Sequence, residues 1–311
     1  MSQRSYEIIS RVERTTNRVL TVGTFDGVHR GHVSIIQAMM SAAEPSDRLT
    51  AVTFDPHPRE VLGHEAISRL MTLEERAHFL LEAGINDVVV IPFDRDLAAI
   101  PARAFVREVL QRSIGFRTIV VGYDHRFGRN GEGDVALLRM LGDEDSFSVL
   151  SVPATLVDGE TVSSSAIRRY LEQDGDVHRA ATLLGRPYTR AGVVVRGDGR
   201  GRKLGFPTAN MQSVDDTVVP ASGVYAVRAS GENLDRAPAV MNIGVRPTFG
   251  GKRVTEEVHV LDWDGDLYDS RLTVEFVRYL RAEQKFDSIE ALVNQLGHDL
   301  KHCRRVLNSV P

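Results

Sequence analysis

Hydrophobic positions follow two different patterns along the chain. Residues 18–185 alternate short β-branched runs with stretches of helical periodicity. Five strands are predicted there, at Val19–Val22, Leu49–Phe54, Val88–Ile91, Thr118–Val121 and Phe147–Val152. Most of these runs are almost continuously apolar, which is typical of strands buried on both faces of a parallel sheet.

Helices are predicted between these strands. Thr72-Leu-Glu-Glu75 has the form of a capping box and opens a predicted helix over Thr72–Ala83. Pro101 takes the first-turn position of a second predicted helix, Pro101–Ser113. Alternating strands and helices in this order predict a doubly wound, Rossmann-like α/β domain.

After Leu184 the pattern changes to short runs separated by Gly, Pro and Asp. The predicted strands are Ala191–Val195, Gly223–Ala229, Ala239–Ile243, Val254–Leu261 and Leu272–Leu280. Helical periodicity returns only at Ile289–Val306. This half predicts an antiparallel β-barrel or sandwich closed by a C-terminal helix. We expect two domains, 1–185 and 186–311, that meet near Gly185.

Composition narrows the functional classes. The chain has 311 residues, 26% of them charged, and a net charge of −4, which excludes a disordered chain and a global basic field for nucleic acid. Cys303 is the only cysteine, so no intrachain disulfide and no cysteine-based zinc site can form. No apolar stretch is long enough for a membrane span. We expect a cytoplasmic protein that binds neither nucleic acid nor membrane.

The lysines are unevenly placed. All four, Lys203, Lys252, Lys285 and Lys301, lie beyond residue 185. If the first half handles phosphate, it must therefore use arginine, histidine, hydroxyl groups or backbone amides.

The first candidate site follows the first predicted strand. Gly23-Thr-Phe-Asp-Gly-Val-His-Arg-Gly-His32 leads directly into a predicted helix, Val33–Met40. Ligands of α/β sheets bind at the carboxyl ends of the strands, and the positive end of the next helix faces them. His29 and His32 can there donate hydrogen bonds to phosphate oxygens. The alternative is that they are ordinary turn histidines.

Further polar segments follow later strands of the same sheet. Val121–Gly128 places Asp124 at the same crevice, and Phe54–Pro58 adds His57. Val162–Arg169 opens a helix, so Ser163 and Ser164 offer hydroxyls and free amides where an anion would bind. Plain N-capping by these serines is the alternative. Four of the ten histidines, at positions 29, 32, 57 and 125, are expected in loops at this one edge.

These motifs together resemble the adenylyltransferase module of the prokaryotic bifunctional riboflavin kinase/FMN adenylyltransferase family, also called FAD synthetase. The resemblance implies that the FMN phosphate attacks the α-phosphorus of ATP directly and that pyrophosphate leaves. It implies phosphate-binding roles for His29, His32, Ser163, Ser164 and Arg168. The other residues implied to bind nucleotide or flavin are Gly23, Phe25, Asp26, His57, Asp124 and Phe127. Two positions depart from the family: His125 stands where many members have Phe, and Ser165 where many have Thr.

The second candidate site is a glycine-rich, basic segment, Arg196–Asn210, after a predicted strand. Its amides can wrap polyphosphate, but it lacks the Gly-Lys-Ser/Thr of a Walker motif. A flexible surface turn is the alternative. The segment ends in Pro207-Thr-Ala-Asn210, where the hydroxyl of Thr208 and the amide oxygen of Asn210 are hard ligands suited to Mg²⁺.

This segment resembles the riboflavin kinase signature of the same family, and Asn242–Gly250, Val254–Val260 and Leu280–Ser288 match the family in the expected order. The resemblance implies a nucleotide-binding set of Gly197, Gly201, Lys203, Gly205, Pro207, Thr208 and Asn210. It also implies a glutamate general base for the ribityl 5′-hydroxyl, which maps to Glu257. Strand alternation gives Glu257 a polar face with Thr255 and His259. Glu256 and Glu275 are its rivals.

The resemblance as a whole implies an enzyme that converts riboflavin to FMN in the barrel and FMN to FAD in the α/β domain. ATP is the co-substrate of both reactions, Mg²⁺ is the expected metal, and a homo-oligomer is compatible with the sequence. The alternatives are a riboflavin kinase with a degenerate first half, a related nucleotidyltransferase joined to another barrel, and a non-catalytic flavin sensor.

Overall fold

A computed structural model describes most of the chain. It covers residues 6–63, 68–197, 201, 204–213, 215–248 and 251–309. The chain divides into two compact units, Met1–Ser164 and Ser165–Pro311. Each unit has the architecture that the sequence predicts for its half, a parallel α/β sheet in the first and a closed antiparallel barrel with a final helix in the second.

The first unit is built on a six-stranded parallel sheet in the order β1-β4-β3-β2-β5-β6. Its strands are β1 (Glu7–Ile8), β2 (Arg18–Val22), β3 (Arg48–Asp55), β4 (Asp87–Pro92), β5 (Thr118–Gly122) and β6 (Ser148–Val152). All five predicted strands are confirmed. β1, the sixth, is only two residues long and therefore carries no recognisable periodicity.

The strand order places the switch point of the sheet between β2 and β5. From β2 the chain continues outward through β3 to β4, whereas β5 and β6 extend the sheet on the other side. The loops after β2 and β5 thus leave in opposite directions, which opens the crevice where ligands of doubly wound sheets bind. The sequence-predicted motifs follow β2, β3 and β5, three neighbouring strands of this sheet.

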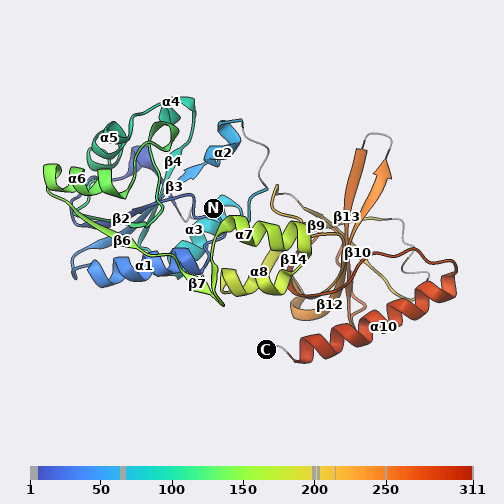
Figure 1. Cartoon of the computed structure of the whole chain (residues 1–311). Helices are drawn as coiled ribbons and strands as arrows, with labels where there is room; N and C mark the ends of the chain where they lie inside the picture. Colours follow the sequence, from blue (N-terminus) through green and yellow to red (C-terminus); the bar gives the residue numbers. More distant parts are fainter. Residues whose placement is uncertain are drawn as a thin grey trace. The chain divides into compact units, whose positions relative to one another are not determined.

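Helices cover both faces of the sheet. They are α1 (Arg30–Ala42), α2 (Pro58–Val61), α3 (Leu73–Glu82), α4 (Arg95–Ala98), α5 (Ala102–Ala104), a π-helical segment η2 (Phe105–Gln111) and α6 (Val135–Asp145). Short 3-10 turns, η1 (Ile9–Arg11) and η3 (Arg129–Gly131), and a hairpin of β7 (Leu156–Val157) and β8 (Glu160–Thr161) complete the unit. Figure 1 shows α1 on one side of the sheet and α5 and α6 on the other.

Two hydrophobic clusters hold these layers together. On one face Ile36 and Met39 of α1 and Leu80 of α3 pack with strand residues. On the other face Leu110 of η2 and Leu138 of α6 do the same. The inner strands β2, β3, β4 and β5 are thus largely buried, which explains their continuous apolar runs, whereas the edge strands β1 and β6 are partly exposed.

The two predicted helix starts have different outcomes. Thr72 caps α3 as predicted, because its Oγ1 accepts the Glu75 N–H at 3.2 Å while Glu75 accepts the Thr72 N–H at 2.9 Å. Pro101 is instead the N-cap of α5, and the chain widens after one turn into the π-helical η2. The widened turn buries Phe105, Val106 and Leu110 together.

The second unit is a closed barrel in the order β10-β13-β12-β11-β14-β9, with every pair antiparallel. Its strands are β9 (Tyr188–Val195), β10 (Ala209–Ser213), β11 (Gly223–Gly231), β12 (Leu234–Thr248), β13 (Gly251–Val260) and β14 (Arg271–Arg281). β10 lies beside β13 rather than beside β11, which is a Greek-key connection. β10 was not among the strands predicted from the sequence.

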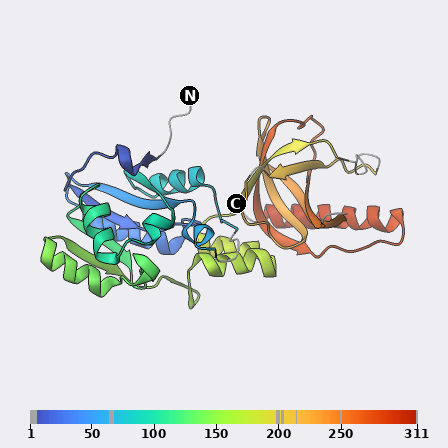
Figure 2. The same cartoon turned by 90° about the horizontal axis from the view of Figure 1, so that it is seen from above.

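A helix packs on the outside of the barrel. α10 (Ile289–Asn308) places Cys303 and Leu307 against Val224, Ala226 and Val240 of β11 and β12. Figure 2 shows this helix, in red, along the barrel wall. Inside the barrel, the guanidinium of Arg190 pairs with the carboxylate of Glu256, Nη2 to Oε1 at 2.8 Å.

Three helical segments lie between the sheet and the barrel in sequence. They are α7 (Ser164–Arg169), the π-helical η4 (Tyr170–Asp174) and α8 (Val177–Leu184). Gly185 ends α8 in the left-handed conformation, with φ 86°. By its contacts this stretch belongs to the barrel unit, although the sequence pattern groups it with the first half. A functional boundary near Gly185 stays a prediction.

Candidate active sites

The first site is built on the turn between β2 and α1. His29 is the N-cap residue of α1, and its N–H donates to Nδ1 of His32 at 3.3 Å. The two imidazole rings are stacked, with centroids 3.7 Å apart and planes 14° apart. Both histidines therefore lie at the positive end of α1, where a helix attracts anions.

The backbone of this turn is strained. Phe25 has φ 49° and the β-branched Val28 has φ 36°, a region that such residues rarely adopt. Both side chains are buried, so core packing holds the conformation. At Gly31 the backbone lies close to His29, because a Cβ there would lie 3.2 Å from the His29 ring. Strain of this kind is concentrated at functional sites.

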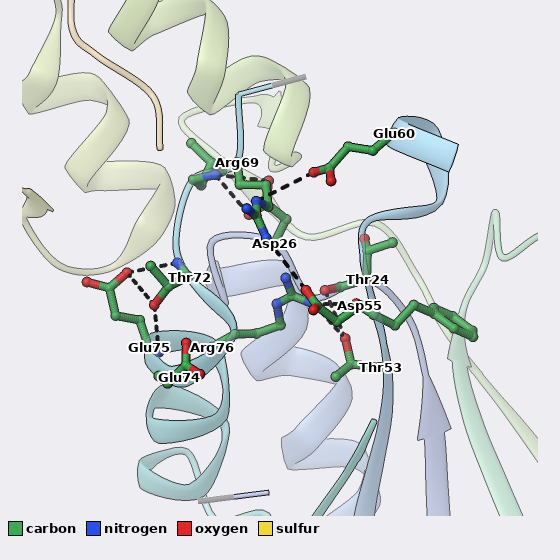
Figure 3. Close-up of polar contacts among 12 residues, drawn as sticks. Thr24, Asp26, Thr53, Asp55, Glu60, Arg69, Thr72, Glu74, Glu75 and Arg76 are labelled. Atoms are coloured by element: carbon green, nitrogen blue, oxygen red, sulfur yellow. Dashed lines mark hydrogen bonds and ion pairs between the residues drawn. The ribbon is translucent and has the colours of Figure 1, made fainter. Parts of the chain in front are cut away.

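Asp26 joins three segments at this turn (Figure 3). Its side chain is 1% exposed, and its two carboxylate oxygens accept the N–H of Leu70 at 2.9 and 3.2 Å. Its carbonyl oxygen accepts the hydroxyl of Ser164 at 2.8 Å. Asp26 thus fixes the turn to the segment before α3 and to the start of α7. The predicted serine motif therefore meets the histidine turn.

Arg76 supports the same region from α3. Its side chain is fully buried, and Nη1 donates to Oγ1 of Thr53 at 3.0 Å and to the carbonyl of Phe54 at 2.9 Å. Burial lowers the pKa of this guanidinium, and the carboxylates of Asp26 and Asp55 oppose that shift. The end of β3 and the Asp26 turn are thus stabilised by one buried cation.

Arg69 forms ion pairs at both ends of the loop after β3. Its guanidinium lies 3.5 Å from Oδ1 of Asp55 and 3.5 Å from Oε1 of Glu60 on α2 (Figure 3). Neither Arg69 nor Arg76 was among the residues predicted for this site from the sequence. The sequence signal that could have indicated them is that they are arginines, because this half contains no lysine that could pair with a carboxylate.

The remaining predicted residues of the first site follow β3 and β5. His57 caps α2 and accepts the N–H of Arg59 on Nδ1 at 3.2 Å. Asp124 is exposed at the end of β5. Burial lowers the pKa of His125 to about 4, whereas neighbouring Asp124 raises it. Phe127 is a core residue, and the His125 ring stacks on it at 5.7 Å.

The serine motif lies at the start of α7. Ser163 directly precedes the helix and Ser164 is its first residue. Arg168 lies later in α7, beyond Ser164, where the first compact unit ends. The roles of these residues toward phosphate stay predictions.

The second site is a row of polar side chains across three barrel strands. Asn210 of β10 is the register partner of Glu257 on β13, and Asn242 of β12 is the partner of the same glutamate on its other side. Residues that face each other in this way lie on one side of a sheet. Buried Glu256 and Val258 point into the barrel, so the row lies on its outer face.

The barrel separates Glu257 from its two rivals. Glu256 is buried and paired with Arg190, and Glu275 on β14 forms an ion pair with Arg236 at 3.1 Å. Glu257 alone of the three is in register with Asn210. Asn242 opens the Asn242–Gly250 motif that matches the family, but no role was predicted for it from the sequence.

The glycine-rich loop approaches this row closely. A Cβ on Gly197 would collide with the amide of Asn210, and one on Gly201 would collide with the Phe206 carbonyl and lie 3.2 Å from Oγ1 of Thr208. Gly205 has φ 84°. Gly197 and Gly201 therefore lie against the Pro207–Asn210 segment. Lys203, also predicted for this site, lies outside the described residues.

The donor set of the second site consists of a hydroxyl and amide oxygens beside one carboxylate. Within the described part of the chain, no three His, Cys, Asp or Glu side chains gather as a metal-binding group. Thr208 and Asn210 are separated by one residue, as side chains on one face of an extended segment are. Hard oxygen ligands in this arrangement fit Mg²⁺.

These two sites define a two-unit transferase that handles phosphate in both halves. A family model described as FAD synthetase matches residues 11–166, and one described as riboflavin kinase matches residues 184–307. The chain belongs to the bifunctional riboflavin kinase/FMN adenylyltransferase family, which confirms the resemblance seen in the sequence.

Curated relatives match over nearly the full length. The bifunctional riboflavin kinase/FMN adenylyltransferase of Escherichia coli K12 is 38% identical, with 90% of each chain covered. The protein of the same name from Bacillus subtilis is 32% identical over 96% of this chain and 95% of its own. Both matches include the two halves in the same order.

A solved structure shares the whole fold. It comes from Streptococcus pneumoniae, has a TM-score of 0.88 and 29% identity, and covers 95% of this chain and 96% of its own. Its title describes a macrolide-efflux protein. Among the helices that the described residues form, none has the length and apolar character needed to cross a membrane.

Proposed function

We propose that this enzyme phosphorylates riboflavin to FMN on the barrel and then adenylylates FMN to FAD on the parallel sheet, with ATP as co-substrate of both steps. The observation that carries the proposal is that each compact unit brings together two key residues of one motif set. Asn210 and Glu257 meet on the barrel, whereas His29 and His32 stack at the switch point of the sheet.

On the barrel, Glu257 is the proposed general base. Its carboxylate takes the proton of the ribityl 5′-hydroxyl as that oxygen attacks the γ-phosphorus of ATP, and the bond to the leaving ADP breaks. Its place on the outer face, in register with Asn210 and Asn242, supports this role. Gly197 and Gly201 let the loop backbone approach the phosphates.

Mg²⁺ is the proposed metal of the kinase site. Thr208 and Asn210 would hold it through the hydroxyl and amide oxygens. When bound, Mg²⁺ neutralises charge on the transferring phosphates. The chain's own part is to present these two oxygens beside Glu257, which the β10–β13 pairing supports.

On the sheet, the phosphate of FMN attacks the α-phosphorus of ATP and pyrophosphate leaves, without a covalent enzyme intermediate. Such a reaction needs positioning and charge stabilisation more than proton transfer. His29 and His32 are proposed to donate hydrogen bonds to the phosphates at the N-terminus of α1. Ser163, Ser164 and Arg168 are proposed to hold the rest of the triphosphate. The hydrogen bond from Ser164 to Asp26 supports a shared site.

The protein is further proposed to be cytoplasmic and to act on small molecules rather than on nucleic acid or membranes. Its net charge of −4 argues against nucleic acid as a partner. A homo-oligomer is part of the same proposal.

The purified protein, incubated with riboflavin, ATP and Mg²⁺, provides the test. Separation of the flavins over time is expected to show FMN first and FAD later. FMN alone would support a kinase with a degenerate first unit. Tight flavin binding without FMN or FAD formation would support a sensor. Either of these two results would contradict the proposal.

A further inference from the structure

His259 lies on the outer face of β13, two residues after Glu257. Its ring nitrogen Nδ1 is 2.7 Å from the carbonyl oxygen of Pro207. Phe206 contacts the same ring edge to face, with centroids 6.0 Å apart and planes at 66°. The histidine is thus in direct contact with the segment that carries Thr208 and Asn210.

The partner fixes the proton on this ring. A carbonyl oxygen only accepts hydrogen bonds, so Nδ1 must carry the hydrogen and donate it. In the neutral ring this leaves Nε2 as the acceptor, and in the charged ring Nδ1 still donates. The anchor therefore depends on a donor at the Nδ1 position.

The bond is made where the backbone ladder ends. The register between β10 and β13 pairs Met211 with Glu256, Asn210 with Glu257 and Ala209 with Val258, and it stops there. Continuing it by one residue would place Thr208 opposite His259. Beyond the end of this register, the His259 side chain binds the carbonyl of Pro207.

Thr208 is therefore held from both directions. Asn210, two residues later, is in the ladder, and Pro207, one residue earlier, is bound to His259. The loop glycine Gly201 lies against its hydroxyl. Without the His259 bond, Thr208, the proposed metal ligand, would be held only by the ladder that begins after it.

We propose that His259 is a positioning residue for riboflavin phosphorylation, which anchors Pro207 so that Thr208 lies in line with Asn210 beside Glu257. This inference rests on the proposed kinase function. His259 does not touch the reacting atoms in this role. It sets the place of the Thr208 hydroxyl, and through it the binding of ATP with its metal.

Three substitutions separate this role from simple packing. In His259→Asn the side-chain nitrogen can occupy about the position of Nδ1, whereas in His259→Gln it lies nearer the position of Nε2. His259→Leu keeps the bulk and removes the donor. For the Leu and Gln variants, the KM for ATP in the kinase reaction is expected to rise about fivefold or more, the effect of losing one hydrogen bond. The Asn variant is expected to stay within about twofold of the original protein.

Two further measurements keep the outcomes distinct. FAD formation from supplied FMN by each variant is expected to be unchanged, which shows that the chain is folded. Phosphorylation of riboflavin by the unaltered protein tests the proposed function itself, independently of the order among the variants. Equal impairment of the Asn and Leu variants, or an unchanged KM for ATP in both Leu and Gln variants, would overturn the role of His259.

Discussion

Asn210 and Glu257 are register partners on the neighbouring strands β10 and β13 of the barrel. Their side chains consequently lie on the same outer face, directly opposite each other. Asn242 completes the row from the other side of Glu257. One carboxylate flanked by two amides, next to a glycine-rich loop, is the arrangement on which the kinase proposal depends.

Replacing Glu257 by glutamine is expected to remove the general base while keeping the shape of the side chain. The rate of FMN formation from riboflavin should fall roughly 100-fold or more. FAD formation from supplied FMN should persist, because Glu257 lies on the barrel. The matched control is Glu275→Gln, another barrel glutamate, whose ion pair with Arg236 serves no proposed step. Equal losses in both variants would argue against Glu257 as the base.

His32→Ala is expected to have the opposite effect. It removes a ring stacked on His29 at the N-terminus of α1, and FAD formation from FMN should fall about 100-fold, as when one preorganised donor is lost. The kinase rate should be unaffected. His78→Ala is the control, since His78 is an exposed histidine of α3 whose partner is Glu82. A His32→Ala protein that still makes FAD at the original rate would exclude this role.

The close approach of Gly197 to Asn210 predicts a steric effect. In Gly197→Ala the added methyl group would displace the Asn210 amide, and the kinase kcat/KM is expected to fall about tenfold or more. Gly297→Ala adds the same methyl group on α10, where, apart from the adjoining residues and backbone of the helix, no atom of the described residues lies within 4 Å, and should leave the rate unchanged. Steady-state kinetics of the two alanine variants decide the point, and a fully active Gly197→Ala would refute the close packing.

The buried pair of Arg190 and Glu256 predicts an effect on stability rather than on chemistry. Glu256→Ala leaves a buried guanidinium without its carboxylate, which should lower the free energy of unfolding by about 3–5 kcal/mol. Glu275→Ala breaks a partly exposed pair and should cost at most about 1 kcal/mol. Urea unfolding of the two variants measures the difference. Similar small losses would mean that Arg190 finds other partners.

The lowered pKa of His125 predicts a pH dependence. In the folded chain burial holds the pKa of His125 at about 4, whereas an unfolded histidine titrates near its ordinary pKa of 6.5. Below the unfolded pKa the unfolded state binds the extra proton, so stability should decrease as the pH falls from 6.5 toward 4. In His125→Phe this part of the decrease should be absent. Identical pH profiles of the two proteins would show that His125 titrates normally.

Much of the fold could be predicted from the sequence because its signals are local. The continuous apolar runs gave the five main strands of the sheet, and the capping box at Thr72 gave the start of α3. β10 was missed because Ala209–Ser213 contains no β-branched residue and reads as the end of a loop. Its pairing with β13 depends on residues far away in the chain.

The residues of the candidate site could be named from the sequence, but their arrangement in space could not. Glu257 could be named from its motif, but Glu256 and Glu275 were excluded only by the strand register and their partners. Long-range contacts, such as the bond from His259 to Pro207, leave no periodic trace in a sequence. Buried Arg76, similarly, looks like a solvated residue of an amphipathic helix until its partners on β3 are seen.

The central claim is that two independent sites act in succession on one chain. The most direct test uses the Glu257→Gln and His32→Ala proteins. Each variant is incubated alone with riboflavin, ATP and Mg²⁺, and a third incubation contains both variants. The account predicts little FMN or FAD from the first, FMN without FAD from the second, and FAD from the mixture. A mixture that makes no FAD, although both variants are folded, would contradict it.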